Sequence, residues 1–274
     1  MRRETQNPGN ATGIDAALAP LLADPDRAAI LLDLDGTLAP IVSRPGDASI
    51  ATTARASLVT VAERYALTAV VTGRRAVVAR SIVGLDGIAY AGNHGFEVLA
   101  PGARRAVPVG ALRGHGEEAP RFGRDLDGAE LEAAGIQIED KGPIVALHWR
   151  QAEDEAAAEE LIERIGAAAE AQGLFTHAGR KVLELRPPVA IDKGFAVAGL
   201  LSGTAVRNAL YAGDDRTDLD AFRELERRRD AGELDAIIRV GVRSEEGPAE
   251  IAERSDLVVA GPSGMGPLLA ALAR

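Results

Sequence analysis

Short apolar runs recur in the first and last thirds of the chain, and segments with helical periodicity separate them. The runs are rich in Ala, Val, Ile and Leu, which is typical of strands that are buried on both faces of a sheet. They lie at 28–32, 67–71, 88–91, 209–212, 236–242 and 256–259. Helices are predicted at 14–22, 51–65 and 193–201, around Val77 to Ile82, around Leu219 to Leu225, and at the end of the chain through Leu272. Strands that alternate with helices predict an α/β fold with a doubly wound, Rossmann-like parallel sheet.

The segment 109–187 follows a different pattern, in which the strands are apolar on one face only. At 144–150 and again at 180–186, apolar residues alternate with charged residues or a histidine. Half-apolar strands predict an open-faced antiparallel sheet that is covered on one side. The helices predicted to cover it lie at 126–134 and 153–171. We therefore expect an inserted α+β cap domain, whose bare polar face turns toward the ligand site of the core.

These patterns divide the chain into a core and an insertion. The predicted catalytic core consists of 14–108 and 188–274, and the cap is 109–187. Residues 1–13 are polar and contain Gly and Pro, so we expect a disordered tail there. A chain of 274 residues is long enough to give the core a substantial hydrophobic interior.

Composition narrows the class of function. The formal net charge of −10 argues against a nucleic-acid partner, because binding to a phosphate backbone needs a basic face. The absence of cysteine excludes disulfides, thiol catalysis and thiolate metal sites. No apolar run approaches the ~20 residues of a membrane span, and the N-terminal residues lack the apolar core of a signal peptide. We expect a cytoplasmic protein with no membrane partner, for which a monomer is plausible.

The first apolar run ends in Asp33-Leu34-Asp35-Gly36-Thr37. Residues i and i+2 of an extended chain point the same way, so Asp33 and Asp35 share one side. Two carboxylates held so close do not both stay ionised unless a positive charge lies between them. Mg²⁺, a hard ion that prefers oxygen ligands, meets this need. Our interpretation is that Asp33 is a nucleophile, that Asp35 is its acid/base partner, and that the pair shares a Mg²⁺ ion.

Two more apolar runs end in polar clusters. Thr72-Gly73-Arg74 follows one run, and its hydroxyl and amides are suited to hold a phosphoryl oxygen. Gly213-Asp214-Asp215-Arg216-Thr217-Asp218 follows the other and brings three acids. Lys193 opens a predicted helix, where a nearby anion would offset its unfavourable interaction with the helix dipole. Ligands of doubly wound sheets bind beyond the carboxyl ends of the strands, so these clusters predict one active-site rim.

Each cluster also has a purely structural interpretation. Asp and Thr after a strand are common in helix caps and Asx turns, and Thr-Gly-Arg alone is a weak signal. Helix capping accounts for one or two acids at 214–218 but not for three. The convergence of the clusters favours chemistry. Among the histidines, His94 and His148 are functional candidates, whereas we expect His115 on the surface and His177 in a structural role.

Four of these motifs, in this order, resemble the signature of the haloacid dehalogenase superfamily of aspartyl phosphohydrolases. That signature is Asp-x-Asp-x-Thr, a Ser or Thr after the second strand, a Lys at a helix start and an acidic pair at a strand end. A cap inserted between the second and third motifs resembles the C2B cap subclass. From about Ala28 onward, further elements are similar to the trehalose-6-phosphate phosphatase family. They are Gly92-Asn93-His94-Gly95-x-Glu97, Lys141 with His148-Trp149-Arg150, Gly179-Arg180-Lys181-Val182-Leu183-Glu184-x-Arg186-Pro187, and Gly213-Asp214-Asp215-x-Thr217-Asp218.

The resemblance implies a Mg²⁺-dependent hydrolysis of trehalose 6-phosphate to trehalose and phosphate, through an aspartyl-phosphate on Asp33 and with Asp35 as acid and then base. Mg²⁺ would be held by Asp33, by the backbone carbonyl of Asp35 and by Asp214. Asp215 or Asp218 would contact the ion directly or through water. The phosphate-binding residues implied are Gly36, Thr72, Gly73, Arg74 and Lys193. The sugar-binding candidates are Asn93, His94, Glu97, Lys141, His148, Arg150, Arg180 and Glu184.

Two positions depart from the family's pattern, and other functions share the motifs. Leu219 stands where the family usually has Glu, which puts a metal-ordering role of that acid in doubt. Arg180 stands where many members carry Lys, which keeps the charge but changes its geometry. The alternatives are another sugar- or polyol-phosphate phosphatase of the superfamily, a phosphomutase, and a non-enzymatic phospho-receiver. The last needs neither an acid at Asp35 nor a cap.

Overall fold

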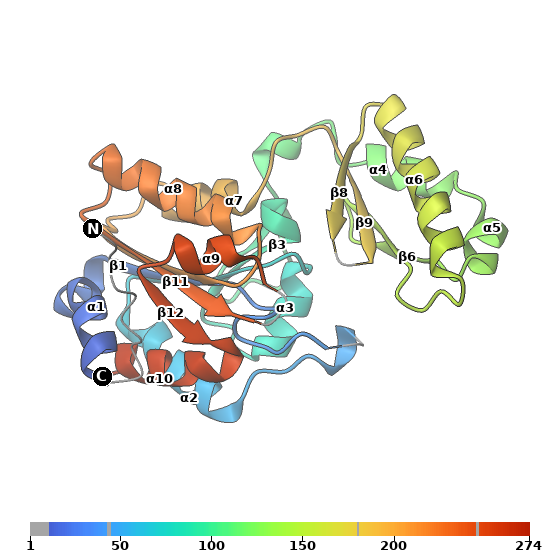
Figure 1. The fold of residues 1–274 in the computed structure, drawn as a ribbon. Helices are drawn as coiled ribbons and strands as arrows, with labels where there is room; N and C mark the ends of the chain where they lie inside the picture. Colours follow the sequence, from blue (N-terminus) through green and yellow to red (C-terminus); the bar gives the residue numbers. More distant parts are fainter. Residues whose placement is uncertain (1–10, 43–44, 180, 245–246) are drawn as a thin grey trace, which may run out of the picture. The chain divides into compact units, whose positions relative to one another are not determined.

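The chain divides into two compact units, which are described separately. A computed structural model describes residues 11–42, 45–179, 181–244 and 247–274. The core unit runs to Val107 and continues over Ile191–Arg274, and the cap unit is Pro108–Ala190 (Figure 1). The cap unit thus begins one residue before the predicted insertion and ends three residues after it.

The core unit alternates strands with helices. Its helices are α1 (Ala11–Ala23), α2 (Thr52–Arg64), α3 (Ala76–Val83), α7 (Lys193–Leu201), α8 (Asp218–Asp230), α9 (Ala249–Glu253) and α10 (Gly261–Leu272). Its strands are β1 (Ala28–Leu32), β2 (Leu67–Val71), β3 (Ala89–Gly92), β4 (Glu97–Leu99), β5 (Val107–Pro108), β10 (Asn208–Gly213), β11 (Ala236–Arg243) and β12 (Leu257–Ala260). Short 3₁₀ turns are η1 (Pro25–Arg27), η2 (Pro45–Asp47) and η3 (Asn93–Gly95).

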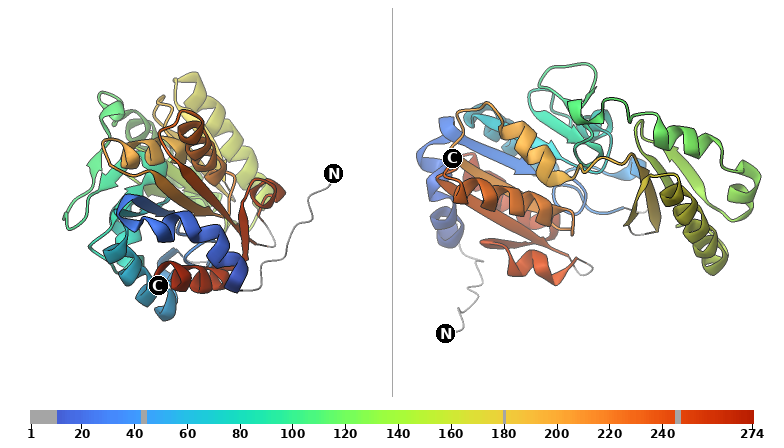
Figure 2. Two further views of the ribbon diagram at one scale, coloured as in Figure 1. Left: turned by 90° about the vertical axis from the view of Figure 1, so that its left-hand side faces the viewer. Right: turned by 90° about the horizontal axis from the view of Figure 1, so that it is seen from above.

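The strand β1 lies in the interior of the large sheet, whose order is β12-β11-β10-β1-β2-β3-β4-β5. It pairs in parallel with β10 on one side and β2 on the other. Its side chains alternate between two apolar clusters. Ile30 belongs to the cluster with residues of α1, α2 and α10, and Leu31 to the cluster with residues of α7 and α8. Helices thus cover both faces of the sheet (Figure 2). Burial on both faces explains why the strand is apolar throughout, and the predicted doubly wound fold is confirmed.

One edge of this sheet differs from the prediction. Strand β4 was not predicted, and it runs antiparallel to β3. The two strands are joined by the three-residue turn η3. A turn this short cannot hold the crossover that a parallel pair needs, so the chain must reverse.

The described residues of the cap unit form a small sheet and three helices. The helices are α4 (Glu118–Arg124), α5 (Gly128–Ala133) and α6 (Glu155–Ala171), with a 3₁₀ turn η4 (Gly110–Leu112). The strands are β6 (Gln137–Asp140), β7 (Val145–His148), β8 (Phe175–Gly179) and β9 (Val182–Arg186). All neighbours in the order β6-β7-β9-β8 pair antiparallel. Leu147 and Leu183 point to the buried face and pack with Ile162 of α6, so the half-apolar pattern is explained.

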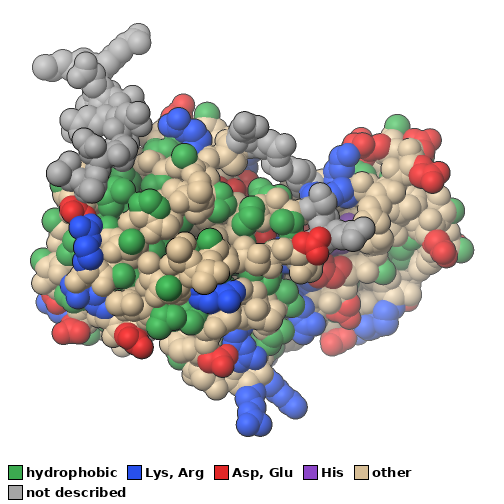
Figure 3. Space-filling view, turned by 90° about the horizontal axis from the view of Figure 1, so that it is seen from below, with side chains coloured by type: hydrophobic (Ala, Val, Ile, Leu, Met, Phe, Trp, Pro, Cys, Tyr) green, Lys and Arg blue, Asp and Glu red, His purple; other side chains and the backbone are tan. Residues whose placement is uncertain are grey.

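The bounds of several elements agree with the sequence pattern, and one end does not. Strands β1 and β2 and helix α7 have the predicted limits. Helix α1 begins at Ala11, inside the segment expected to be a tail, and residues 1–10 lie outside the described residues. In the part of the chain that the structure describes, none of the helices has both the length and the hydropathy of a membrane span. Acidic and basic side chains are interspersed over the face drawn in Figure 3.

Candidate active site

Acids from opposite ends of the chain meet because β1 and β10 are parallel neighbours. Leu32 lies opposite Ala212, so both strands end at the same level. The amide of Asp33 extends the ladder and donates to the carbonyl of Ala212 at 2.9 Å. Asp33 and Asp214 therefore follow their strands at one edge of the sheet, as the parallel arrangement predicts.

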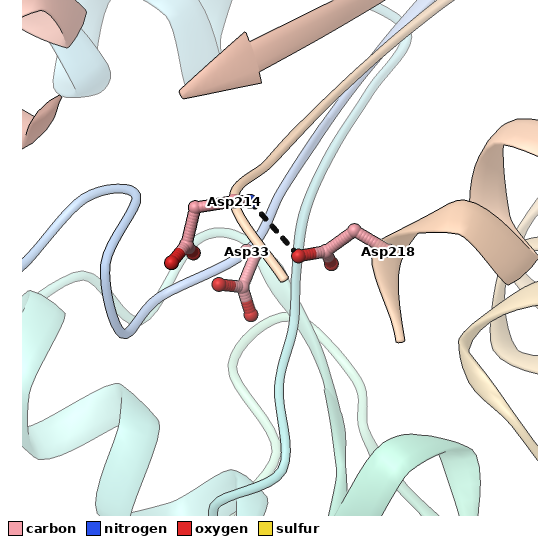
Figure 4. Close-up of side chains that lie close together, drawn as sticks. All are labelled: Asp33, Asp214 and Asp218. Atoms are coloured by element: carbon pink, nitrogen blue, oxygen red, sulfur yellow. Dashed lines mark hydrogen bonds between the residues drawn. The ribbon is translucent and has the colours of Figure 1, made fainter. Parts of the chain in front are cut away.

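Three buried carboxylates gather at this edge. One oxygen from each of Asp33, Asp214 and Asp218 lies within 4.8 Å of the others, which is a group that could hold a metal ion. Figure 4 shows Asp33 and Asp214 beside each other, with Asp218 reaching in from the start of α8. Asp215 is exposed, and its carboxylate accepts a hydrogen bond from the amide of Arg216. Of the two acids predicted as outer ligands, Asp218 is thus the one in the cluster.

The motif after β1 makes room for Asp214. Gly36 has φ +85°, a left-handed conformation, and a Cβ there would overlap the carboxylate of Asp214. Thr37 donates its hydroxyl hydrogen to Oδ1 of Asp214 at 3.0 Å. The amide of Gly36 donates to the carbonyl of Ala39. Gly36, predicted to bind phosphate, thus contributes space while its N–H closes a local turn.

Lys193 bridges two of the acids. Its Nζ lies 2.7 Å from Oδ1 of Asp33 and 2.6 Å from Oδ1 of Asp218. The residue begins α7, and Asp192 caps that helix by accepting from the amide of Phe195. Burial alone would lower the pKa of Lys193, but the two neighbouring carboxylates raise it overall. The ammonium group is therefore charged and anchored at the predicted strand-end site.

One ammonium group does not neutralise three carboxylates. Burial raises the pKa of Asp33 well above its usual range, and Lys193 opposes that shift only in part. Burial and the charge of Asp218 raise the pKa of Asp214 to about 7. Carboxylates crowded into a buried site resist ionisation until a cation joins them. The electrostatics thus favour a bound cation.

Asp35 is held by Arg74. Nε of Arg74 lies 2.7 Å from Oδ2 of Asp35, and Nη2 lies 2.7 Å from Oδ1. Arg74 follows Thr72 and Gly73 after β2, and its amide donates to the hydroxyl of Thr72 at 3.1 Å. Arg74 was predicted to bind phosphate, and in this structure its guanidinium group binds the predicted acid/base residue.

The turn η3 lies against the Thr72-Gly73-Arg74 turn. The amide of Asn93 donates to the carbonyl of Arg74, and that of His94 donates to the carbonyl of Thr72. Asn93 and His94 both have positive φ, 51° and 58°, which is costly for residues with side chains. A Cβ on Gly73 would lie 2.6 Å from Nε2 of His94, so the glycine admits the imidazole. The structure thus places His94 at the predicted phosphate-binding turn.

Glu97 has a structural function in this region. Its Oε1 accepts from the amide of Ala76 at 2.7 Å, and Ala76 is the first residue of α3. The carboxylate therefore caps the helix, which Arg75 at the N-cap position does not do. A contact of Glu97 with a sugar remains a prediction.

The polar face of the cap sheet carries a connected ionic group. Glu184 accepts from Nζ of Lys141 at 2.9 Å, and its other oxygen accepts from Nε and Nη2 of Arg186 at 2.9 and 2.6 Å. On the same face, Nε2 of His148 lies 3.0 Å from Oε2 of Glu139. Two predicted sugar-binding residues remain: Arg150 is exposed after β7, and Arg180 lies outside the described residues.

A family model described as trehalose-phosphatase matches residues 31–257. The chain belongs to the trehalose-phosphatase family. The match spans every motif of the core site from Asp33 to Asp218, and it includes the whole cap unit.

Relatives and solved structures agree with membership of the trehalose-phosphatase family. The trehalose-phosphate phosphatase of Mycobacterium marinum is 35% identical over 167 residues, which is 56% of this chain and 40% of that protein. An uncharacterized glycosyl hydrolase of Mycobacterium tuberculosis is 38% identical over 164 residues, 56% of this chain and 12% of its own length. The chain therefore aligns with less than half of each relative.

Two solved structures share the fold over nearly their whole length. A trehalose-6-phosphate phosphatase related protein is 27% identical, with a TM-score of 0.69 over 88% of this chain and 95% of that chain. The C-terminal domain of trehalose-6-phosphate phosphatase from Candida albicans is 20% identical, with a TM-score of 0.75 over 94% and 96%. The second likeness shows a common fold.

The departure at Leu219 has a packing explanation. Where the trehalose-phosphatase pattern has an acid, this side chain is buried and joins the apolar cluster that contains Ala196 and Val197 of α7. The position thus stabilises the contact between α7 and α8 here. Lys193 starts α7 and Asp218 starts α8, so this contact supports the two helix ends that form the site.

Four residues near the sites were not assigned a role from the sequence. They are Thr37, Glu139, Arg186 and Tyr211. Thr37 belongs to the Asp-x-Asp-x-Thr motif, and Arg186 and Glu139 share a strand face with predicted residues, so the pattern contained a signal for each. Tyr211 donates its hydroxyl hydrogen to Asp218 at 2.7 Å. It lies within an apolar strand, and nothing in the local pattern marked it.

Proposed function

We propose that this chain is a Mg²⁺-dependent phosphatase that hydrolyses trehalose 6-phosphate to trehalose and inorganic phosphate. The observation that carries the proposal is the contact of Asp33 with Lys193. This contact lies beside Asp214 at one edge of the large sheet, in a chain that belongs to the trehalose-phosphatase family. It joins a nucleophile, a fixed positive charge and a second carboxylate in one buried place. Phosphoryl transfer depends mainly on such positioning and charge stabilisation.

The donor set fits a magnesium ion. Asp33 and Asp214 offer carboxylate oxygens, and the space that Gly36 leaves is filled by the carboxylate of Asp214. We assign the backbone carbonyl of Asp35 as a further ligand. A bound Mg²⁺ supplies positive charge that neutralises the acids and the phosphoryl oxygens.

Asp33 is the proposed nucleophile. Lys193 holds its Oδ1, so Oδ2 is the oxygen that attacks phosphorus. The new P–O bond forms as the bond from phosphorus to the sugar oxygen breaks, and the sugar oxygen takes a proton from Asp35. Water, deprotonated by Asp35, then attacks the aspartyl-phosphate, which releases phosphate and restores Asp33. Acid/base catalysis of this kind contributes typically ~10²–10⁴-fold.

The ion pair of Asp35 with Arg74 sets a condition on this mechanism. Both oxygens of Asp35 accept hydrogen bonds from Arg74, so neither is available to the sugar oxygen while this contact lasts. We propose that Arg74 moves from Asp35 to a phosphoryl oxygen when the substrate binds. Phosphate is an anion that a guanidinium fork also matches well. Asp35 is then free to hold the proton that the sugar oxygen receives.

Recognition of the sugar is assigned to the polar face of the cap. Glu184 has both oxygens fixed by Lys141 and Arg186, so the carboxylate is oriented before any ligand arrives. A site of oriented polar groups rejects analogues that lack the matching hydroxyls. His148 and Arg150 extend the proposed surface, and Arg180, outside the described residues, stays a candidate from the sequence.

The deciding experiment is phosphate release from trehalose 6-phosphate beside glucose 6-phosphate, with and without Mg²⁺. We expect Mg²⁺-dependent turnover that strongly favours the disaccharide. Equal release from both substrates would support a general sugar-phosphate phosphatase. Phosphate retained on a rearranged sugar would indicate a mutase, and phosphorylated protein without turnover would indicate a phospho-receiver.

A further inference from the structure

Asp218 lies in the acid cluster, yet its acceptor positions are already occupied. It is fully buried at the first residue of α8. Its Oδ1 accepts from Nζ of Lys193 at 2.6 Å and from the hydroxyl of Tyr211 at 2.7 Å. Its Oδ2 accepts from the amides of Asp214 and Asp215 at 3.0 and 2.9 Å. A carboxylate offers about four lone-pair sites, so four donors satisfy it.

The loop is built around this carboxylate. A Cβ at Gly213 would overlap the carboxyl group of Asp218, so only glycine lets it lie beneath the strand end. The two amides that Asp218 accepts from belong to the next two residues, and one of these is Asp214. Asp218 thus supports the backbone of a proposed metal ligand, while its own oxygens are directed to protein donors.

Tyr211 supplies the donor that can be removed alone. Lys193 also holds Asp33, and two of the four donors are backbone amides. The ring of Tyr211 is fully buried in β10 and packs edge-on against Phe222, with centroids 6.0 Å apart and an interplanar angle of 86°. A phenylalanine keeps this packing and loses only the hydroxyl.

We propose that the Tyr211 hydroxyl is a positioning group that keeps the Asp218 carboxylate on Lys193 and off the cation, and thereby sets which divalent ion the site prefers. Without it, Oδ1 has a lone pair with no donor, in a carboxylate that lies within 4.8 Å of Asp33 and Asp214. The carboxylate can then turn and become a ligand. Ca²⁺ accepts six to eight oxygens in flexible geometry, whereas Mg²⁺ demands an octahedron and keeps several waters. An added carboxylate therefore favours Ca²⁺.

The test compares cation binding by wild-type protein, Tyr211→Phe and a matched control. In Tyr90→Phe another fully buried tyrosine of the core unit loses a hydroxyl, which donates to the carbonyl of Leu85 at 2.6 Å. Titration calorimetry of the metal-free proteins gives the Ca²⁺ and Mg²⁺ dissociation constants. We expect their ratio to shift toward Ca²⁺ by ~10-fold in Tyr211→Phe, the lower end for a residue that orients a metal site, and to stay unchanged in Tyr90→Phe.

Counting the water molecules bound directly to the metal tests whether Asp218 has become a ligand. With Mn²⁺ as the bound ion and H₂¹⁷O as the solvent, spectroscopy should show one inner-sphere water fewer in Tyr211→Phe than in the other two proteins. Tyr211→Met removes the same hydroxyl with a different apolar side chain, and its ratio must shift in the same direction. An unchanged ratio, or an equal loss of both affinities, overturns the proposal. The inference rests on the metal site of the proposed function, but these measurements use no substrate. Absent phosphatase activity would therefore count against the function and leave this test intact.

Discussion

The guanidinium group of Arg74 binds the carboxylate of Asp35 with two parallel hydrogen bonds, from Nε to Oδ2 and from Nη2 to Oδ1, each 2.7 Å long. The pair is partly buried, with 17% of the Arg74 side chain and 33% of the Asp35 side chain exposed. Two-pronged arginine–carboxylate contacts are among the stronger hydrogen-bonded pairs, because charge and geometry both contribute. The pair therefore holds the proposed acid/base residue in one orientation, and it must open before Asp35 donates a proton.

Replacing Arg74 tests whether its guanidinium group binds the phosphoryl group of the substrate or only forms an ion pair with Asp35. If Arg74 moves to a phosphoryl oxygen, Arg74→Ala should lower kcat/KM by ~10²–10³-fold, as the loss of a charged donor to a transition state does. Steady-state phosphate release from trehalose 6-phosphate and p-nitrophenyl phosphate measures this, and both substrates should be affected. Arg75→Ala, at the exposed neighbour, should stay within about 2-fold. Activity equal to or above wild type in Arg74→Ala would mean that the arginine only masks the acid.

The proposed nucleophile can be removed without changing its shape. We expect Asp33→Asn to fold and to lose ~10³-fold or more in kcat, because the attacking oxygen is gone. The metal-free variant should unfold no more easily than wild type. Burial already makes the charge of Asp33 unfavourable, since its pKa is raised. Phosphate release and thermal unfolding in EDTA measure the two effects. Hydrolysis at near wild-type rate would rule out the nucleophile assignment.

The fold could be predicted largely because a strand that is buried on both faces has a simple sequence pattern. The strand 28–32 is apolar at every position because both of its faces are covered, and this pattern is hard to confuse with a half-exposed strand. Strand β4 has only three residues, Glu97–Leu99, which is too short for such a signal. The left-handed backbone conformation of Asn93 and His94 could not be predicted either, because tertiary contacts impose it on residues that do not favour it.

The site was predictable as a set of residues at strand ends, but not as a set of contacts. Parallel strands bring Asp33 and Asp214 to one edge, and this follows from topology alone. Which charged side chains form ion pairs depends on distances between segments far apart in the chain. Lys193 and Arg74 were predicted to meet phosphate, and in the structure both contact aspartates. No local sequence pattern records these pairings.

Glu184 provides a test of sugar recognition. We expect Glu184→Gln to lose ~10-fold or more in kcat/KM for trehalose 6-phosphate and much less for p-nitrophenyl phosphate, which has no sugar to recognise. Glutamine keeps a shape that Lys141 and Arg186 can still contact, whereas alanine would leave two largely buried cations without their acceptor. For Glu184→Ala the same order of losses is expected, with a lower unfolding temperature.

A matched control lies in the same unit. Glu155 forms an exposed ion pair with Lys181, and Glu155→Gln should change neither substrate by more than about 2-fold. Equal losses on both substrates in Glu184→Gln would count against a sugar-binding role and point to a general effect on the cap.

Two glycine variants separate the effect of lost space beside Asp214 from the effect of backbone strain. Gly36→Ala adds a Cβ that overlaps the carboxylate of Asp214, and it also strains a left-handed backbone. Gly102→Ala has the strain alone, because φ is +70° there and no atom lies within 4 Å of the new Cβ. We expect both variants to lose about 1 kcal/mol of stability from strain, and Gly36→Ala alone to lose Mg²⁺ affinity by ~10-fold or more. Calorimetric Mg²⁺ titration checks this, and unchanged affinity in Gly36→Ala would contradict the proposed ligand position.

The pH dependence of stability should reveal the crowded acids directly. In metal-free protein the pKa of Asp214 is about 7, against 3.8 when unfolded. Between these values the folded state keeps a proton that the unfolded state has lost, so the free energy of unfolding falls as pH rises. Asp214 contributes a slope of at most about 1.4 kcal/mol per pH unit, which ends above about pH 7.

Urea unfolding in EDTA should show a flatter slope for Asp214→Asn than for wild type. Saturating Mg²⁺ should flatten the wild-type slope, because the cation then stabilises the charged carboxylate. Identical slopes for both proteins in EDTA would mean that Asp214 ionises normally without a cation.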